Sequence, residues 1–325
     1  MPHRPRWTRF VRRARRAGDP VGAIAVDVLR ARGFEPSRPL GLGVFVEEEG
    51  SRFGRACLGS RLVTGATTWD EARELRDRDG VALADALEAE GLDGTPGTFL
   101  DGVGTFVELH VEQGRDLVHR DEPVGVASAI WPHGRYRFDF AGEANHAGTT
   151  RMEDRRDPML TYAMSALAAN KRARLSGQRA TFGRVDVRPN GTNAVPSHVT
   201  AWLDARAESS EALESLLADV ERQAQERAGR DGTSLTVTAE SVSPEVVFDP
   251  ALAARIAGPH AWPVIPTAAG HDAGVISSAG IPTAMLFVRN PTGVSHSPDE
   301  HAETADCLAG VTALADTLEL LAGER

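Results

Sequence analysis

The feature that most constrains this chain is a change in hydrophobic pattern that begins near residue 134 and ends near residue 242. Within this stretch, strand-like segments that alternate apolar and polar residues and two long helix-like segments follow the order β-α-β-β-α-β. That order is typical of a ferredoxin-like sandwich, in which a sheet is covered by two helices. We therefore expect residues 132–242 to form a compact domain of their own.

The sequence on either side of this domain has a different character, because helices alternate there with short apolar strands. GAIAVDVLRARGFEP has apolar residues at helical spacing, with a glycine and a proline near its end, which predicts a helix. The continuous apolar runs in IPTAMLFV and PLGLGVFVEEEG predict buried strands, the second of which ends in carboxylates. We therefore predict one α/β domain, residues 1–131 and 243–325, that residues 132–242 interrupt.

Composition excludes several classes of partner. The chain has 325 residues, of which 41% are hydrophobic, so it is long enough for two cores. A net charge of −10 argues against nucleic acid or an anionic membrane surface as the main partner, and no apolar run reaches transmembrane length. The two cysteines, Cys57 and Cys307, predict a reducing cytoplasm rather than a disulfide framework. Residues 1–17 are rich in arginine and unlike the rest of the chain.

The most informative cluster for chemistry is VEEEGSRF, at the end of a predicted strand. Three adjacent glutamates repel one another, so a positive partner must compensate them. One interpretation is a solvated acidic loop. The other is a metal site, in which one carboxylate binds a divalent cation and a neighbour takes a proton from the attacking water.

Three histidines favour the metal site. ELHVEQG contains His110, AAGHDAG contains His271 and GVSHSPDE contains His296, all beside polar residues between core elements. A single histidine of this kind is more often structural than a ligand. Several of them together with the glutamates indicate mixed oxygen and imidazole ligands, which suit zinc, manganese or another divalent transition metal.

Six motifs occur in the order expected of one known family: FVEEEGSRF with LGS, ELHVEQG, GEANHAGTTRMEDRRD, RPNGTNAVPS with LDAR, AGHDA and GVSHSPDE. The chain resembles the metal-dependent amidohydrolases that include allantoate amidohydrolase, N-carbamoyl-L-amino-acid hydrolase and β-ureidopropionase, which are related to the aminoacylase-type metallopeptidases. The resemblance runs from about residue 18 to the C-terminus. It implies a zinc-peptidase-like α/β catalytic domain with an inserted ferredoxin-like domain that acts as a lid and in dimerisation.

The resemblance also implies roles for ten residues. The catalytic residues are Glu48, as general base, and His146, which stabilises the oxyanion and often acts across the dimer interface. The implied metal ligands are Glu49, His110, His296 and Asp19. The implied substrate-binding residues are Asn193, Arg206, Gln113 and His271, with Arg206 as a bidentate fork for a carboxylate.

The chain departs from the family at its N-terminal end. The family carries a metal-binding His-x-Asp element upstream of the glutamates, which this sequence lacks, and an Asp-Gly whose aspartate bridges two metals. Here the order is Gly18-Asp19, and the only upstream histidine is His3. We therefore expect an N-terminally truncated or frame-disrupted chain, in which one of the two family metal sites is weakened.

These observations lead to one functional expectation and two rivals. We expect a cytoplasmic, homodimeric, metal-dependent amidohydrolase that cleaves a linear ureido C–N bond in a small carboxylate, with allantoate as the first choice. Hydrolysis of N-carbamoyl-L-amino acids uses the same machinery and stays open. The third possibility is a catalytically impaired homologue that keeps the dimer but lacks the first metal-site histidine.

Overall fold

The computed structural model describes residues 20–91, 100 and 102–323, and it divides into two units. The first unit comprises Met1–Ile130 and Val246–Arg325, and the second comprises Trp131–Glu245. The second unit is slightly wider than the expected 132–242 for a physical reason. Its strand β8 (Ser234–Ser243) runs on until it pairs with His133, so its pairing extends past the expected limit.

The first unit is built on a five-stranded sheet in the order β1-β11-β2-β10, with β9 paired to β2. Its strands are β1 (Phe106–Val111), β2 (Val124–Ile130), β9 (Val246–Val247), β10 (Val264–Thr267) and β11 (Thr283–Val288). β11 is parallel to β1 and antiparallel to β2. All of its residues are buried, with Ala284 and Leu286 in one core and Met285 and Phe287 in the other. The prediction of a buried strand in IPTAMLFV is confirmed.

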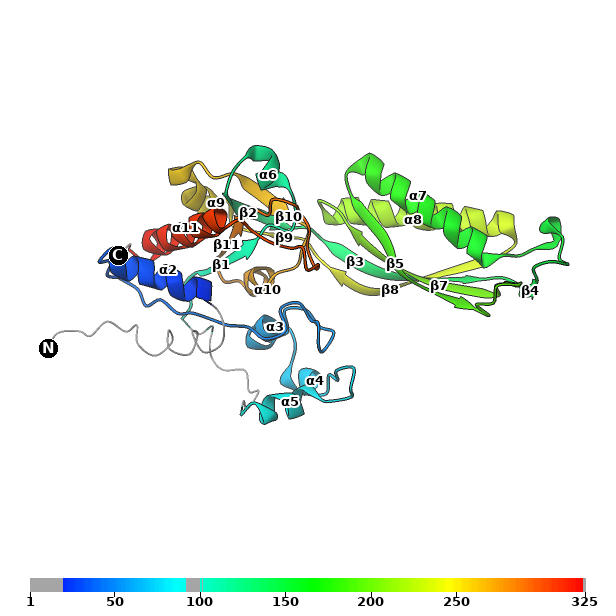
Figure 1. The fold of residues 1–325 in the computed structure, drawn as a ribbon, viewed down its shortest axis with the longest axis horizontal. Helices are drawn as coiled ribbons and strands as arrows, with labels where there is room; N and C mark the ends of the chain where they lie inside the picture. Colours follow the sequence, from blue (N-terminus) through cyan, green and yellow to red (C-terminus); the bar gives the residue numbers. More distant parts are fainter. Residues whose placement is uncertain (1–19, 92–99, 101, 324–325) are drawn as a thin grey trace. The chain divides into compact units, whose positions relative to one another are not determined.

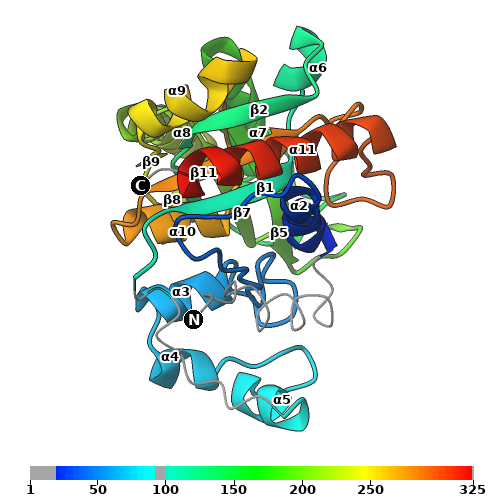
Figure 2. The ribbon, with the colours of Figure 1, turned by 90° about the vertical axis from the view of Figure 1, so that its left-hand side faces the viewer.

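Helices cover both faces of this sheet. α2 (Pro20–Ala31), α9 (Pro250–Ala257) and α11 (Thr304–Ala322) share one core with the sheet, and α2 and α11 lie side by side in front of it in Figure 2. α10 (Asp272–Ser278) packs on β1 and β11 from the opposite face. The shorter elements of this part are α6 (Asp116–Arg120) and η2 (Gly258–His260).

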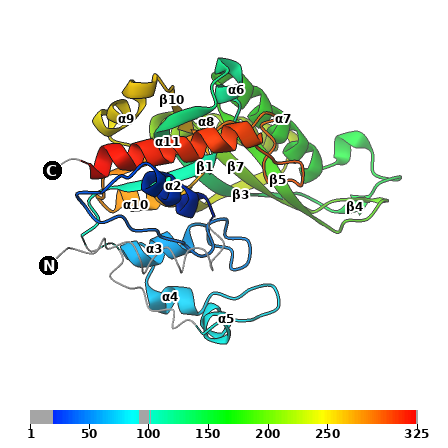
Figure 3. The ribbon, with the colours of Figure 1, turned by 60° about the vertical axis from the view of Figure 1, so that its left-hand side comes forward.

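Three short helices form a small separate cluster in the first unit. They are α3 (Leu58–Thr64), α4 (Trp69–Arg73) and α5 (Leu83–Ala89), gathered below the sheet in Figure 3. Their core contains Phe53, Leu58, Leu62, Ala72 and Leu83. α3 also contacts α10, which connects this cluster to the sheet.

The strand predicted in PLGLGVFVEEEG does not form. Residues 39–46 pair with no strand among the described residues, and the side chains of Val44 and Val46 are exposed. The segment is anchored instead on the start of α3, where Gly59 donates its N–H to the Val46 carbonyl at 2.9 Å. An apolar run becomes a strand only with a hydrogen-bonding neighbour, and that neighbour is not encoded locally.

The second unit is a four-stranded antiparallel sheet in the order β5-β7-β3-β8. The strands are β3 (His133–Ala141), β5 (Arg179–Arg188), β7 (His198–Arg206) and β8. α7 (Pro158–Ser176) and α8 (Ser210–Asp231) pack on one face, around a core that contains Phe138, Phe140 and Leu203 (Figure 1). This arrangement confirms the predicted β-α-β-β-α-β sandwich.

Local signals set the ends of these two helices. Asp157 accepts the N–H of Met159 at 2.9 Å at the start of α7, and Ser209 accepts that of Ala212 at the start of α8. Both helices end at glycines with positive φ, Gly177 and Gly232. The remaining elements of this unit are β4 (Asn145–His146), η1 (Met152–Asp154) and β6 (Ala194–Val195). Within the described part of the chain, no helix is long and apolar enough to cross a bilayer.

Candidate active site

Three side chains from distant parts of the sequence meet in the first unit. Glu48, His110 and His271 each offer a ligand atom, and these atoms all lie within 4.8 Å of one another. Glu48 lies in the loop before α3, His110 is on β1 and His271 is the N-cap residue of α10. The two imidazole rings meet edge to face, with centroids 4.5 Å apart.

β1 positions His110 and a second carboxylate on the same face. Glu108 lies two residues before His110, so both side chains point to the side of the sheet that α10 covers. Nδ1 of His110 lies 2.8 Å from the Val111 carbonyl, which can only accept a hydrogen bond. Nδ1 therefore carries a proton, and Nε2 is the ring nitrogen that remains to bind a cation. The carboxylate of Glu108 accepts the N–H of Ala273 at 2.7 Å.

His271 is almost fully buried, with 2% of its surface exposed, and neither ring nitrogen has a hydrogen-bond partner among the described residues. Burial, with a smaller effect from His110, lowers the pKa of His271 to about 3, so its ring is neutral. The next residue, Asp272, accepts a hydrogen bond of 2.5 Å from the hydroxyl of Ser60 on α3. This bond ties the N-terminus of α10 to the loop that carries Glu48.

The three consecutive glutamates have different surroundings. Glu47 is structural, because its carboxylate accepts the N–H groups of Arg52 and Phe53 in the following turn. Glu48 is half-buried in the cluster. Burial first, and then the charges of Glu49 and Asp272, raise the pKa of Glu48 to about 7. Nε2 of His296 lies 3.1 Å from Oε2 of Glu49.

The donor set fits a divalent cation. Burial raises the pKa of Glu108 to about 8, with the N–H of Ala273 opposing the shift, and burial also raises the pKa of Asp272. Buried carboxyl groups are thus crowded around the imidazoles of His110 and His271, and the lone pair of the neutral His271 ring has no partner among the described residues. A cation bound to imidazole and carboxylate ligands would supply the positive charge that the cluster needs.

The loop that presents His296 is held by its own polar residues. Asn290 is fully buried, and its amide bonds the backbone of Thr292, Gly293 and Val294. Gln113 donates to the hydroxyl of Ser295 at 3.0 Å, so it braces this loop from the end of β1. Among the described residues, no third histidine, cysteine or acidic ligand atom completes the pair of Glu49 and His296. Asp19, the ligand implied by resemblance, lies outside the described residues.

His146 lies in the second unit, on β4, where it pairs with Ala194 of β6. Its Nδ1 accepts the backbone N–H groups of Gly148 and Thr149, at 3.0 and 3.2 Å. Because one nitrogen of a neutral imidazole accepts and the other donates, Nε2 carries the proton. The side chain is exposed, so His146 presents an N–H donor to whatever lies in front of it.

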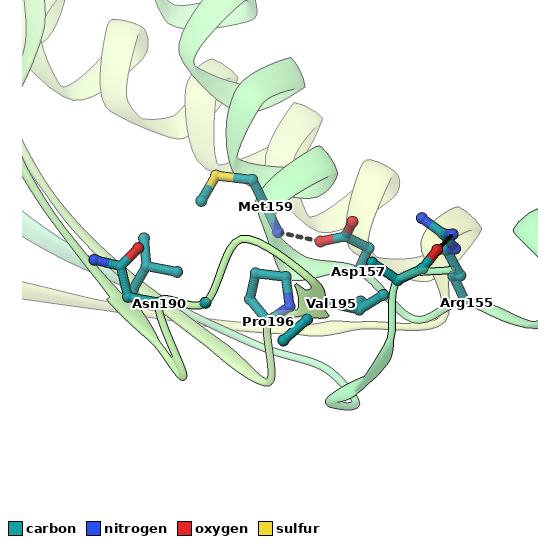
Figure 4. Close-up of a pocket in the computed structure, with 10 residues that line it drawn as sticks. Arg155, Asp157, Met159, Asn190, Val195 and Pro196 are labelled. Atoms are coloured by element: carbon teal, nitrogen blue, oxygen red, sulfur yellow. Dashed lines mark hydrogen bonds between the residues drawn. The ribbon is translucent and has the colours of Figure 1, made fainter. Parts of the chain in front are cut away.

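Arg155 braces the turn that follows His146. Its guanidinium donates to the carbonyls of Ala147, at 2.7 Å, and Thr150, at 3.1 Å. Arg155 also lines a pocket of about 250 Å³ within this unit, with Asp157 near it and Asn190 at the other end (Figure 4). The turn is thus fixed to the start of α7.

The two residues implied to grip a carboxylate lie far apart in one chain. The backbone carbonyl of Asn193 accepts the N–H of Ala147 at 2.9 Å, so Asn193 is beside His146. Arg206 is the last residue of β7, where it donates to Asp204 at 2.8 Å. β7, which starts at His198, spans roughly 25 Å at about 3.3 Å per residue. A single chain therefore does not bring Arg206 together with Asn193 and His146.

Three residues of the site lie within the quoted motifs but were given no role from the sequence: Glu108, Asp272 and Ser60. Period-two spacing from His110 would have identified Glu108, if the segment had been recognised as a strand. Asp272 adjoins His271 in the AGHDA motif, and Ser60 belongs to the LGS motif. The hydrogen bond between Ser60 and Asp272 could not be predicted from either motif, because it joins distant parts of the chain.

Comparison with known proteins assigns the family. The model of peptidase family M20/M25/M40 matches residues 17–320. The chain belongs to this family. An N-carbamoyl-L-amino acid amidohydrolase of Geobacillus stearothermophilus is 35% identical over 93% of this chain and 77% of its own length. An allantoate amidohydrolase of Escherichia coli is 31% identical over 93% of this chain and 75% of its own length.

A solved structure shows the same fold. A hydantoinase/carbamoylase family amidase from Burkholderia multivorans superposes with a TM-score of 0.83 at 27% identity, covering 94% of this chain and 75% of its own. Membership of this family and the similarity to these relatives identify the protein as a hydrolase that acts on C–N bonds. The cluster of Glu48, His110 and His271 is the place in the described residues where its metal can bind.

Proposed function

We propose that this M20/M25/M40 hydrolase uses a divalent metal to cleave a linear ureido C–N bond in a small carboxylate, with allantoate as the first substrate. The observation that carries the proposal is the meeting of Glu48, His110 and His271 within 4.8 Å. Allantoate amidohydrolases of Escherichia coli and Bacillus subtilis, each 31% identical, support the substrate. The relative at 35% identity supports the second candidate, an N-carbamoyl-L-amino acid.

Each residue of the cluster has a chemical task. His110 would bind a zinc or manganese ion through Nε2, and Glu49 with His296 would provide the first two ligands of a second site. A bound divalent cation polarises the scissile carbonyl and lowers the pKa of water. Glu48 lies close enough to the imidazoles to take a proton from water at this place and to deliver it to the leaving nitrogen.

The substrate-handling residues require a second copy of the chain. His146 donates its Nε2–H to the oxygen that gains negative charge, and Arg206 binds the substrate carboxylate. These residues lie at opposite ends of β7, so one small substrate cannot contact both in the same chain. A homodimer in which each active site takes His146 and Asn193 from one subunit and Arg206 from the other removes this difficulty.

The surface of the second unit supports such a dimer. α7 exposes a row of apolar side chains at helical spacing: Leu160, Met164, Leu167 and Leu175. β5 is an edge strand of the sheet, with a free side for pairing. Exposed apolar rows and open edges are typical of surfaces that another chain covers. We place the enzyme in the cytoplasm, which agrees with its two free cysteines, Cys57 and Cys307.

The test is a comparison of substrates on protein loaded with zinc or manganese. We expect ammonia release from allantoate, slower cleavage of N-carbamoyl-L-amino acids, and a loss of both activities in Glu48→Gln. The reverse order of substrates would favour the second candidate. Turnover of a plain N-acyl amino acid, without either ureido substrate, would contradict the proposal. A folded, metal-loaded protein without any turnover would instead indicate a catalytically impaired homologue.

A further inference from the structure

We propose that His271 is itself a ligand of the divalent cation and that it binds through Nε2, beside Nε2 of His110. The inference rests on the proposed function, because it concerns the same metal. The motif AAGHDAG made His271 one of three candidate ligands, and the family resemblance gave it only a substrate-binding role; the inference names it as a ligand and names the nitrogen that binds. The two histidines would form the imidazole half of the site. His110 lies on β1, and His271 lies at the start of α10, which packs against β1.

The first argument is the state of the His271 ring. A buried polar nitrogen without a partner destabilises a fold, and such groups are rare in native structures. Both nitrogens of His271 are in this condition, although the residue is 2% exposed. A core histidine would use at least one of them in a hydrogen bond. A metal ion at Nε2 gives the ring the partner that the described residues do not supply.

The second argument is the tautomer of His110. Its Nδ1 donates to the Val111 carbonyl, which leaves Nε2 as the free ligand atom. A backbone carbonyl on the other ring nitrogen is the usual support of a metal-binding histidine. The ring of His271 meets this ring edge to face at a centroid distance of 4.5 Å. A cation bound beside both rings would therefore be within reach of both imidazoles.

The third argument is the position of Glu108. One of its carboxylate oxygens accepts the N–H of Ala273, and the other lies 3.9 Å from Nδ1 of His271. At 3.9 Å this contact is not a hydrogen bond, but it shows which ring nitrogen faces the carboxyl group, and a carboxylate on the outer side is common at metal-binding histidines. Nδ1 therefore faces Glu108 and Nε2 is the ligand. The short bond from Ser60 to Asp272 holds the backbone of this segment in place.

The experiment measures zinc binding directly, in full-length protein that carries His296→Gln so that the pair of Glu49 and His296 is silenced. His271→Gln and His133→Gln are then added separately. His133 is the matched control, because among the described histidines it also has a buried ring nitrogen without a partner, yet it lies in the second unit. Competition with a chromophoric chelator gives the affinity, and X-ray absorption at the zinc edge counts imidazole ligands.

We expect His271→Gln to weaken zinc binding by at least about 100-fold, since even supporting residues contribute 10- to 100-fold. The imidazole count should fall from two to one, and His133→Gln should leave both readouts unchanged. Unchanged affinity in His271→Gln with a count of one before the substitution would overturn the inference, while hydrolysis by the unaltered enzyme would leave the proposed function standing.

The remaining outcomes also decide. Loss of zinc in His271→Gln, in a protein that hydrolyses neither ureido substrate, would support the inference and refute the proposed function. If circular dichroism shows that His271→Gln does not fold, the imidazole count in the His296→Gln protein decides alone. Two imidazoles support His271 as a ligand, and one excludes it. Failure of the unaltered protein to bind zinc or manganese would overturn both.

Discussion

At the scale of single residues, the turn after His146 determines which nitrogen of its imidazole ring carries the proton. Two backbone N–H groups point at Nδ1, and the neutral ring must therefore present a proton at Nε2. A preorganised neutral donor is suited to an oxygen that becomes negative during the reaction. Arg155 holds this turn in place by donating to the carbonyls of Ala147 and Thr150. Arg155 is therefore a positioning residue.

We expect Arg155→Ala to lower kcat about 10- to 100-fold and to change KM little, because a small displacement of a donor weakens transition-state stabilisation more than substrate binding. Steady-state kinetics on the preferred substrate measures this split, and Arg155→Lys should recover part of the loss. The matched control is Arg151→Ala, in the same turn, whose exposed guanidinium pairs only with Glu153 among the bonds described. Equal kinetic effects of the two alanine substitutions would contradict a specific role for Arg155.

His133 makes the stability of the second unit depend on pH. Burial first, and then the charge of Arg206, lower the pKa of this histidine below its usual value of 6.5. Between 6.5 and the lowered pKa, the unfolded chain binds more protons than the folded one. The stabilisation is therefore complete above about pH 6.5 and is lost as the pH falls toward the folded-state pKa. Urea unfolding at pH 8 and pH 5 should show a smaller difference in His133→Gln than in the unaltered protein.

At the scale of elements, the contact between α3 and the extended segment before it positions Glu48. A Cβ added at Gly59 would lie 2.7 Å from the Val46 nitrogen, so only glycine allows this approach. We expect Gly59→Ala to destabilise the protein by about 1–3 kcal/mol, as overpacking does. Gly229→Ala is the control, because its Cβ would meet nothing within 4 Å in helix α8, and it should stabilise by about 0.5–1 kcal/mol. Thermal unfolding of both variants checks the difference in sign.

The same elements show what a sequence can and cannot predict. α7 and α8 were predictable, because their apolar spacing, polar N-caps and terminal glycines are all local signals. The strand predicted at residues 39–46 was wrong because strand pairing depends on a neighbour that is distant in sequence, which local signals do not reveal. The site divides in the same way. His110, His271 and His296 stand out by their motifs, but the contact of His271 with Glu108 exists only after β1 and α10 have packed.

At the scale of the whole molecule, the proposed sharing of the site between two subunits predicts complementation. His146→Ala and Arg206→Ala should each be inactive as homodimers. When the two are co-expressed, activity should return to about a quarter of the original, because half of randomly paired dimers are mixed and each has one complete site. Rate assays on the purified mixture give this fraction. Pairing His146→Ala with the double variant should restore nothing. No recovery in isolated mixed dimers would place both residues in the site of one chain.

The order of strands in the first unit has a consequence for synthesis. β11, which separates β1 from β2 in the sheet, is synthesised only after the whole second unit. The second unit is contiguous in sequence and has its own core, so it can fold before β11 is available to pair with β1 and β2. A nascent chain that ends at Glu245 already contains Glu48 and His110, but not His271. With the proposed ligands, such a chain holds only one of the two imidazoles, and the exposed edges of β1 and β2 are what a chaperone would have to protect until β11 is made.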